Sequence, residues 1–552
     1  MSVAPSLSPL HTDTDNLTRI ERITLIALAT LSLLLRAVAY FRYRFDSDEP
    51  QHLHVAWGWT AGLVQYRDYF DNHAPLFHML SAPLVAALGE RADILLYMRA
   101  TMLPLLAVVI GGTYVIGRRF YSARVALWSA VILSLYPSFF LKTLEYRTDN
   151  LWNALWVVAL LVLTSGTATA ARMFAVGAIL GIATCVSLKT PLLVVALALA
   201  AVATRFALRE GFRAGEMLAR AGTFTLGLVI APAAMAMWFA HLHALPDLVY
   251  CVFEFNKLIA HTHAHAILLR VAYPFMLAFV VWYGWRIGDD RPVDPAARTR
   301  FFLGMLLAMF SETLMSVWVL ISPRDLLPIM PLGAIAFCSW LIGRVKSRRV
   351  LTALFAALTA IYVVAIGYGS EWLANPPGTQ IEMVRQALQL TRPGDTLIDL
   401  KGETIFRQRP YYFVFEKITR DAIHAGLLPD RVAESVVRHR CHVAQADSMS
   451  FPPRSRQFLR ENFLPVGLLR ASGQWLRADG TFTIAIPGDY VMLDRNGQCG
   501  GMLDGAPYSG PRYLAGGAHR FLADRAGRIA CLWSPAYQRG FSPFHLRHQR
   551  YE

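Results

Sequence analysis

The sequence predicts an α-helical polytopic membrane protein that ends in a soluble region made of an α/β module and a β-sandwich. Three observations predict this fold class. Hydrophobic residues make up 55% of the 552 residues and charged residues only 16%, against roughly 25% charged residues in soluble domains. The apolar residues form long blocks without charges, such as LVVALALAAVA and GLVIAPAAMAMWF. After Tyr368 the composition changes, and short segments replace these blocks.

The apolar blocks are long enough to cross a bilayer. A helix needs about 20 largely apolar residues to span a hydrocarbon layer of ~30 Å, and about eleven blocks approach that length. The predicted spans are 23–40, 100–116, 125–141, 151–163, 173–188, 190–204, 221–239, 267–285, 301–321, 326–342 and 350–368. The block 75–89 is shorter. We expect it to form a juxtamembrane helix, since counting it as a span would move the basic turn at Arg118 outside.

Basic residues predict the orientation of the spans. Lys and Arg collect in short turns such as 118–119 and 344–349, and basic loops stay on the cytoplasmic side. We therefore expect a cytoplasmic N-terminus and, with an odd number of spans, a C-terminal region outside the membrane. The net charge of +15 comes from the basic residues in these turns. We therefore exclude nucleic-acid binding as the reason for this charge. The first apolar run lacks a small-residue cleavage site, so we expect it to be a retained helix.

Four regions follow from these patterns. After Tyr368 the chain continues with TQIEMVRQALQL, which has helical spacing, and TLIDL, which is typical of a strand. Beyond Gly480, segments such as FTIAIPGDYVML alternate and are separated by turn residues, which indicates a β-sandwich. The predicted regions are a cytoplasmic tail (1–22), a transmembrane domain (23–371) with its first extracytoplasmic loop (41–99), an α/β module (372–475) and a β-sandwich (476–552).

The six cysteines lie far apart, without the spacing of a metal site. Cys185 and Cys338 lie within apolar blocks and are expected to be small buried hydrophobic residues. Cys499 and Cys531 belong to the region predicted to lie outside the membrane. An extracytoplasmic environment would allow a disulfide between them, and free thiols are the alternative.

The first outer loop carries two groups of acids. Asp46, Asp48 and Glu49 follow directly after the first span, and Asp68, Asp71 and His73 follow within the same loop. A solvated loop that anchors the helix end would explain the first group alone. Two acidic clusters on one loop can also converge on a single site, and this predicts a site at the membrane boundary.

Several motifs in this order resemble one family. They are DE after the first span, GLVQYRDY and HAPLF in the first loop, GRRFYSARVAL after the second span, EYRTDNL, SLKTPLL and SPRDLLPIMP. Together they resemble the C-type (GT-C) membrane glycosyltransferases, in the branch of bacterial protein-O-mannosyltransferase-like and lipid A aminoarabinose transferases. The likeness covers about residues 19–349, and Asp325 stands where an aromatic residue is commoner in the family.

This resemblance implies transfer of a sugar from a polyprenyl-phosphate carrier, with inversion at the anomeric carbon. Asp48 matches the family's acid that contacts the acceptor and acts as general base, with Glu49 beside it as the second catalytic residue. A carboxylate within hydrogen-bond reach can take the proton of an attacking hydroxyl. The substrate-binding candidates beside them in the first loop are Asp46, Asp68, Asp71 and His73.

Cations near the leaving phosphate would stabilise its developing charge. Arg147, Lys189 and Arg324 lie at outer ends of predicted spans and are candidates for this role. The alternative for each is a side chain that extends to the lipid–water interface and binds nothing.

Metal binding is a weaker prediction. Asp46-Ser47-Asp48 forms a D-x-D pattern that can hold a divalent cation through oxygen ligands, and imidazoles bind zinc. The candidate ligands are His261, His263 and His265. A lipid-phosphate donor does not require a metal as nucleotide-sugar donors often do, so we expect no obligatory cofactor.

The sequence therefore predicts an enzyme of the bacterial inner membrane with an outward-facing site. Its partners would be a polyprenyl-phosphate sugar, an acceptor glycan, lipid or protein, and the bilayer. A lipid-linked glycan ligase and a transporter or flippase of lipid-linked sugars are the alternatives. Transporters show internal repeats and ionisable residues at mid-membrane, whereas this chain has no convincing repeat and almost no acids in its spans apart from Glu312.

Overall fold

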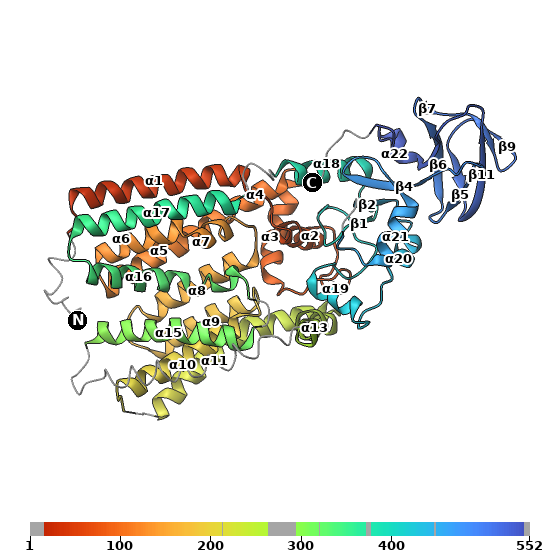
Figure 1. Ribbon diagram of the computed structural model, residues 1–552. Coiled ribbons are helices and arrows are strands. Elements are labelled where there is room, and N and C mark those ends of the chain that lie inside the picture. The colour runs from red at the N-terminus through yellow and green to blue at the C-terminus, as the bar shows by residue number, and fades with distance from the viewer. Residues whose placement is uncertain are drawn as a thin grey trace.

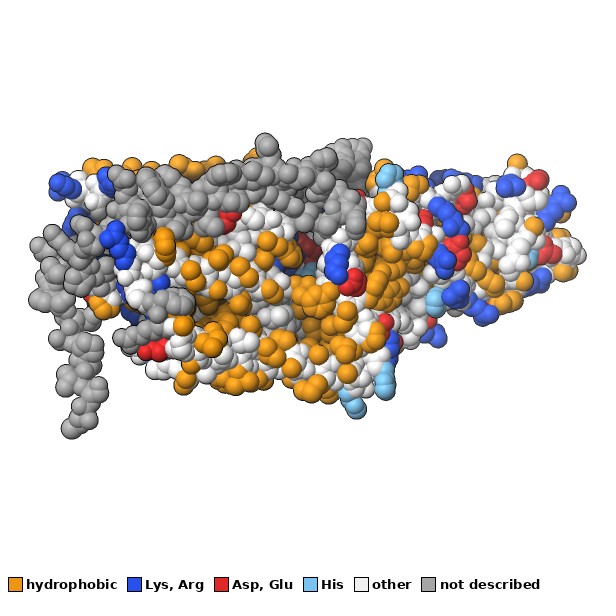
Figure 2. Space-filling model, turned by 90° about the horizontal axis from the view of Figure 1, so that it is seen from below, with side chains coloured by type: hydrophobic (Ala, Val, Ile, Leu, Met, Phe, Trp, Pro, Cys, Tyr) orange, Lys and Arg blue, Asp and Glu red, His pale blue; other side chains and the backbone are white. Residues whose placement is uncertain are grey.

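The computed structural model describes residues 16–211, 214–262, 294–318, 321–370, 377–445 and 449–545. A bundle of helices makes up one part, and a C-terminal region of strands and short helices lies against one end of it (Figure 1). Hydrophobic side chains cover much of the bundle face seen in Figure 2, whereas charged side chains crowd the C-terminal region. This division matches a membrane part and a solvated part.

Among the described residues, six helical segments are long and apolar enough to cross a membrane. They are α1 (Arg19–Arg42), α4 with α5 (Ile94–Ala100 and Met102–Phe120), α10 (Thr190–Ala207), α11 (Ala214–His241), α15 (Pro295–Val317) and α17 (Arg348–Ser370). Shorter apolar helices are α3 (Leu76–Leu88), α6 (Ala123–Leu135), α8 (Thr148–Leu163), α9 (Ala170–Thr184) and α16 (Met330–Arg344). The predicted polytopic helical membrane protein is confirmed.

The predicted spans coincide with these helices, except that 267–285 lies outside the described residues. The predicted span 125–141 consists of two helices, α6 and α7 (Pro137–Lys142). A proline forces the preceding residue out of the helical conformation, and Tyr136 accordingly has an extended backbone with ψ 122°. The predicted span is therefore interrupted between α6 and α7, and the residues that follow α7 lie at the end of the bundle.

Helices α9 and α11 approach each other at backbone contact because glycines form their interface. A Cβ atom added at Gly177 would lie 2.0 Å from the backbone oxygen of Phe224, and one at Gly181 would lie 2.5 Å from that of Leu228. Gly227 on α11 has the same relation to the backbone of α9. Small residues four apart allow such close packing between membrane helices. Lys189 lies in the short connection from α9 to α10.

The helices run alternately toward and away from the C-terminal region (Figure 1). α1, α6, α9, α11, α15 and α17 run toward it, and α5, α8, α10 and α16 run away from it. The acid-bearing loops and the C-terminal region therefore share one end of the bundle, and the basic turns around 118–119 and 344–349 lie at the other end. Which end faces the cytoplasm stays a prediction.

Short elements occupy the end that carries the acids. They are α2 (Asp48–Thr60), α12 (Leu245–Val249), a π-helical turn η1 (Tyr250–Glu254), α13 (Phe255–Thr262) and a 3₁₀ turn η3 (Pro323–Leu326). α2 packs on α3, and both lie next to the C-terminal region (Figure 1). We call the contact between α2, residues 61–75, η3 and residues 399–416 the junction.

The C-terminal region contains two sheets. The first has the order β1-β2-β4-β12-β6-β10, with β3 on β4 and β7 on β6, and only β1 and β2 pair in parallel. The second has the order β5-β11-β8-β9 and is antiparallel. Side chains from both sheets share one apolar cluster that contains Phe482, Tyr490 and Phe521, so a β-sandwich forms as predicted. β4 pairs with β2 and with β12, so the first sheet runs without a break across residue 475; the four domain ranges stay predictions.

The elements of this region have the following bounds. The strands are β1 (Leu397–Ile398), β2 (Val443–Gln445), β3 (Phe463–Pro465), β4 (Leu469–Trp475), β5 (Thr481–Ile484), β6 (Gly488–Asp494), β7 (Gly497–Gln498), β8 (Gly501–Leu503), β9 (Ala506–Tyr508), β10 (Arg512–Leu514), β11 (Gly517–Ala523) and β12 (Ala530–Trp533). The helices are α18 (Gly378–Leu390), α19 (Lys417–His424), α20 (Val432–Arg438), α21 (Pro453–Asn462) and α22 (Ser534–Gln538).

The structure contradicts the disulfide between Cys499 and Cys531, because both thiols are free. Cys531 on β12 lies opposite Met492 on β6, and the backbone N–H of Cys499 donates to the Met492 carbonyl from the other side of β6, at 3.0 Å. Neighbouring strands lie about 4.8 Å apart, so two cysteines separated by a strand lie roughly 10 Å apart. A disulfide needs Cα atoms within about 7 Å.

Candidate active site

The start of α2 places the first group of acids. Asp48 and Glu49 lie in the first helical turn, where the free N–H groups of a helix favour negative charge. The Glu49 carboxylate accepts a hydrogen bond from the backbone N–H of Asp46 at 2.8 Å. This local loop directs Asp46 and Asp48 toward the junction and turns Glu49 inward.

Glu49 is fully buried and holds α2 in place. Its two oxygens accept from the Arg99 guanidinium at 2.5 and 2.7 Å, and one also accepts from the backbone N–H of Tyr146 at 2.9 Å. The side chains of Glu49 and Arg99 both have 0% exposure. Glu49 therefore ties α2 to α4 and to the start of α8, and its predicted catalytic role stays a prediction that this burial does not favour.

Asp46 and Asp48 meet cations from distant parts of the chain. Arg147 pairs with Asp46 at 3.0 Å and with Asp48, and Arg324 pairs with Asp46. Arg324 also donates to the buried Glu145 at 2.9 Å. The first loop, the turn before α8 and η3 thus converge on one ion-pair network.

Lys189 extends this network. Its ammonium lies 3.0 Å from Asp149, which pairs with Arg147 at 3.3 Å, and it also pairs with Asp325. The same ammonium lies 5.7 Å from the ring centres of Trp152 and Trp318. Asp325, where the resemblance leads us to expect an aromatic residue, pairs with Lys189.

The C-terminal region supplies a further cation that the sequence does not predict. Lys401 pairs with Asp48 and donates to the Ser47 hydroxyl at 2.9 Å. Burial alone would raise the pKa of Asp48, but Arg147 and Lys401 hold that pKa well below its usual value. Asp48 is thus a carboxylate with a cation on each oxygen, and its side chain is still 25% exposed.

A tight turn carries Lys401 into the junction. Asp399 accepts from the backbone N–H groups of Gly402 and Thr404 at 2.8 and 2.9 Å and pairs with Arg409 at 3.0 Å. Gly402 has φ +95°, and an added Cβ would lie 2.6 Å from the His54 ring. The turn can reach α2 this closely because residue 402 has no side chain.

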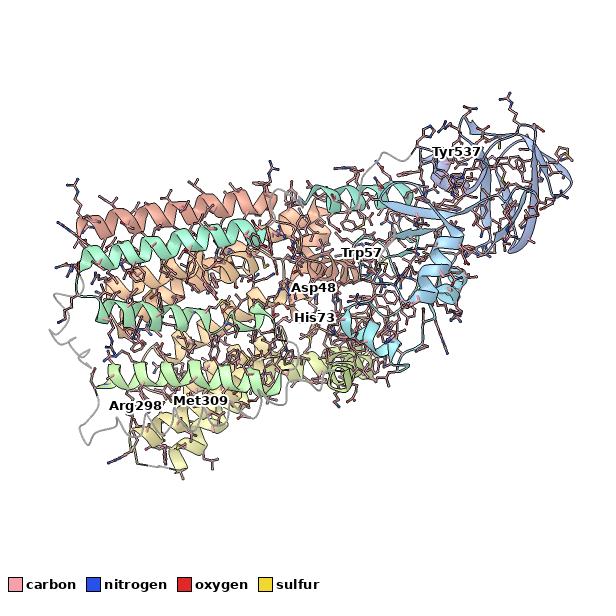
Figure 3. All side chains as sticks on the ribbon, viewed as in Figure 1. Asp48, Trp57, His73, Arg298, Met309 and Tyr537 are labelled. Atoms are coloured by element: carbon pink, nitrogen blue, oxygen red, sulfur yellow. The ribbon has the colours of Figure 1, made fainter. Side chains whose placement is uncertain are left out.

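The second acidic group, Asp68, Asp71 and His73, forms two separate sets of contacts. Asp68 accepts from the Val64 N–H at 2.7 Å and pairs with the neighbouring Arg67, so it stabilises its own turn and lies outside the ion-pair network. Asp71 is fully buried and accepts from His73 Nδ1 at 2.8 Å, and the His73 side chain is 26% exposed. Figure 3 shows His73 near Asp48, between the bundle and the C-terminal region.

The comparisons with known proteins concern the fold. No protein-family model and no curated protein sequence matches the chain. The structure of ArnT from Cupriavidus metallidurans bound to undecaprenyl phosphate matches with TM-score 0.53 and 13% identity, over 79% of this chain and 94% of that chain. The apo form of the same ArnT matches with TM-score 0.51 and 14% identity, over 81% and 97%. This chain has the GT-C glycosyltransferase fold. The Archaeoglobus fulgidus oligosaccharyltransferase is a more distant match, with TM-score 0.43 and 12% identity over 86% of this chain and 72% of that chain.

The GT-C fold brings together most of the residues predicted for its site. Arg147, Lys189 and Arg324 come from three separate connections and join one network with Asp46 and Asp48. Lys401 was missed because nothing in the KGET segment marks it as facing a loop more than 350 positions away. The only local signal was the Lys-Gly pair after a short strand.

The metal prediction stays open in this GT-C chain. His263 and His265 lie outside the described residues, as does the side chain of His261. Within the described residues, no group of three or more His, Cys, Asp or Glu side chains is arranged to hold a metal ion. The D-x-D carboxylates Asp46 and Asp48 are engaged by arginine and lysine side chains.

Proposed function

We propose that the protein is a glycosyltransferase that moves a sugar from a polyprenyl-phosphate carrier to an acceptor of the bacterial cell envelope. The acceptor would be lipid A or lipopolysaccharide, a polysaccharide or a protein. Transfer would occur at the periplasmic face of the inner membrane, with inversion at the anomeric carbon. One observation carries the proposal: Arg147, Lys189, Arg324 and Lys401 converge with carboxylates at one end of an apolar helix bundle.

This arrangement suits a lipid-linked phosphate. The lipid tail would lie along the apolar helices, and the phosphate would reach the charged end of the bundle. Guanidinium groups bind phosphate through two parallel hydrogen bonds. Arg147 and Arg324 provide two guanidinium groups in a partly buried setting. The ArnT structure with bound undecaprenyl phosphate supports such a ligand for the fold.

The cations would also act on the chemical step. The bond between the anomeric carbon and the phosphate oxygen breaks as the acceptor oxygen attacks, and negative charge grows on the phosphate. Cations fixed beside it stabilise that charge, and removal of one such group typically lowers kcat by about 10²- to 10³-fold. Because each cation already has a carboxylate partner, donor binding requires the phosphate to take over some of these contacts.

A donor screen tests the proposal. The full chain would be purified into lipid nanodiscs and supplied with undecaprenyl-phosphate monosaccharides and with lipid A, polysaccharide and peptide acceptors. We expect release of undecaprenyl phosphate with at least one sugar, a strong loss in Arg147→Gln, and unchanged release in Arg495→Gln, whose exposed side chain lies in the turn between β6 and β7. No release by the wild type, or equal release by Arg147→Gln, would contradict the proposal.

A further inference from the structure

Asp48 is poorly suited to take a proton in this structure. One of its oxygens accepts from Lys401 and the other from Arg147. Protonation of Asp48 would remove a negative charge from between two cations, and this makes the carboxylate a weak base. In this arrangement of ion pairs Asp48 is a poor proton acceptor, and the junction holds another candidate for the general base.

Asp71 and His73 have the geometry of a general base. Asp71 accepts from His73 Nδ1 at 2.8 Å, so it fixes the neutral ring with its proton on Nδ1 and leaves Nε2 as the acceptor. Within the described residues, no hydrogen bond occupies Nε2. Asp71 itself is fixed by Gln65, whose amide donates at 2.7 Å and in turn accepts from the Trp59 indole at 2.9 Å.

The dyad lies beside the ion-pair network. The His73 ring packs on that of His52 with 4.6 Å between the ring centres, and His52 lies four residues after Asp48 on α2. Residues four apart share one face of a helix, so His73 packs on the face of α2 that carries Asp48. On the other side of the junction, Asn72 donates to Glu416 at 2.7 Å. Figure 3 shows Asp48 and His73 at the same level of the molecule.

We propose that His73, oriented by Asp71, is the proton acceptor of the transfer reaction. In the step, the acceptor oxygen bonds to the anomeric carbon and its proton passes to His73 Nε2. The bond from that carbon to the phosphate oxygen breaks, and its electron pair leaves with the polyprenyl phosphate. Asp71 stays ionised as a positioning residue that stabilises the imidazolium, and the proton on His73 later passes to water. This proposal rests on the proposed function.

The surroundings of His73 determine its pH dependence. The titratable groups around it are Asp71, His52, His78, Arg147 and Glu416. Burial opposes the charged ring, but Asp71 and Glu416 outweigh burial and Arg147, so the pKa of His73 lies above its usual value. Burial also raises the pKa of Glu416 to about 7. Because only neutral His73 can accept a proton, kcat should fall as the pH drops through the His73 pKa.

The test compares pH profiles of kcat for the full chain in nanodiscs, with the undecaprenyl-phosphate sugar that the wild type turns over. We expect an acid limb in the wild type with an apparent pKa above 6.5, because the usual histidine value is about 6.5. His73→Gln should lower kcat about 10²- to 10⁴-fold and remove the limb. Asp71→Asn and Glu416→Gln should keep a limb and move it to lower pH, because each removes a negative charge beside His73. The control His439→Gln changes an exposed residue after α20 and should match the wild type.

A second measurement separates this proposal from the proposed function. Carbethoxylation of His73, followed by peptide mass spectrometry across pH without substrate, should report a pKa above 6.5 that falls in Asp71→Asn. A wild type that transfers no sugar refutes the proposed function, and the dyad is then judged from carbethoxylation. An active wild type whose His73→Gln variant keeps kcat and the acid limb refutes the proton acceptor. If the acid limb disappears only in Glu416→Gln, the general base is Glu416 and not His73.

Discussion

Replacement of Gly402 by alanine should disconnect the C-terminal region from the ion-pair network. Gly402 has φ +95°, and its added Cβ would lie 2.6 Å from both Cβ and Cγ of His54. Carbon atoms normally pack at about 3.5–4.0 Å, so the turn or α2 must retreat by about 1 Å. That turn carries Lys401, which reaches Asp48 from the adjacent position.

Two effects contribute to the expected cost. An alanine in left-handed backbone conformation is strained by about 1–2 kcal/mol, and an overpacked contact costs about 1–3 kcal/mol more. Since misplacement by about 1 Å can lower a rate ~10²-fold, we expect a Gly402→Ala protein that folds, unfolds at a lower temperature and loses kcat by about that factor.

Gly394 provides the matched control. It has φ +90° in the same region, but a Cβ added there has nothing within 4 Å. Gly394→Ala therefore carries the backbone strain without the contact. The assay measures Tm and kcat for both variants in nanodiscs. If Gly402→Ala retains the kcat of Gly394→Ala, the turn does not position Lys401 and the reasoning is wrong.

Three further predictions concern the framework, the cofactor and the topology. Arg99→Met should leave Glu49 as an unpaired buried carboxylate and destabilise the protein by about 3–5 kcal/mol; a Tm equal to that of the wild type would contradict this. Exhaustive chelation should leave transfer unchanged, and loss of transfer that zinc restores would establish a metal requirement. A membrane-impermeant thiol reagent added to intact cells should label Gly62→Cys in the first loop and not Ser165→Cys after α8; the reverse result would place the site in the cytosol.

The sequence predicts the membrane fold well because hydropathy is a local property. Each apolar block was visible without knowledge of its neighbours, and Pro137 alone accounts for the division of one predicted span into α6 and α7. Pairing in three dimensions has no such local signal. The disulfide considered for Cys499 and Cys531 rested only on their shared region, and the strand β6 separates them. Lys401 likewise reaches Asp48 only through a turn that the fold positions.

The adjacent acids Asp48 and Glu49 occupy different environments in the structure, which the family motif does not indicate. The family motif treats the two residues as one unit, but successive residues on a helix point about 100° apart. At the start of α2 this rotation sends Glu49 to Arg99 in the interior and Asp48 to the junction. Glu49 is fully buried in an ion pair with two hydrogen bonds and keeps α2 in position. Asp48 is partly exposed between Arg147 and Lys401 and can contact a ligand. The acid pair thus combines one framework contact with one contact to the site, and under our proposal the proton of the acceptor passes to a third group, His73, which has the free ring nitrogen.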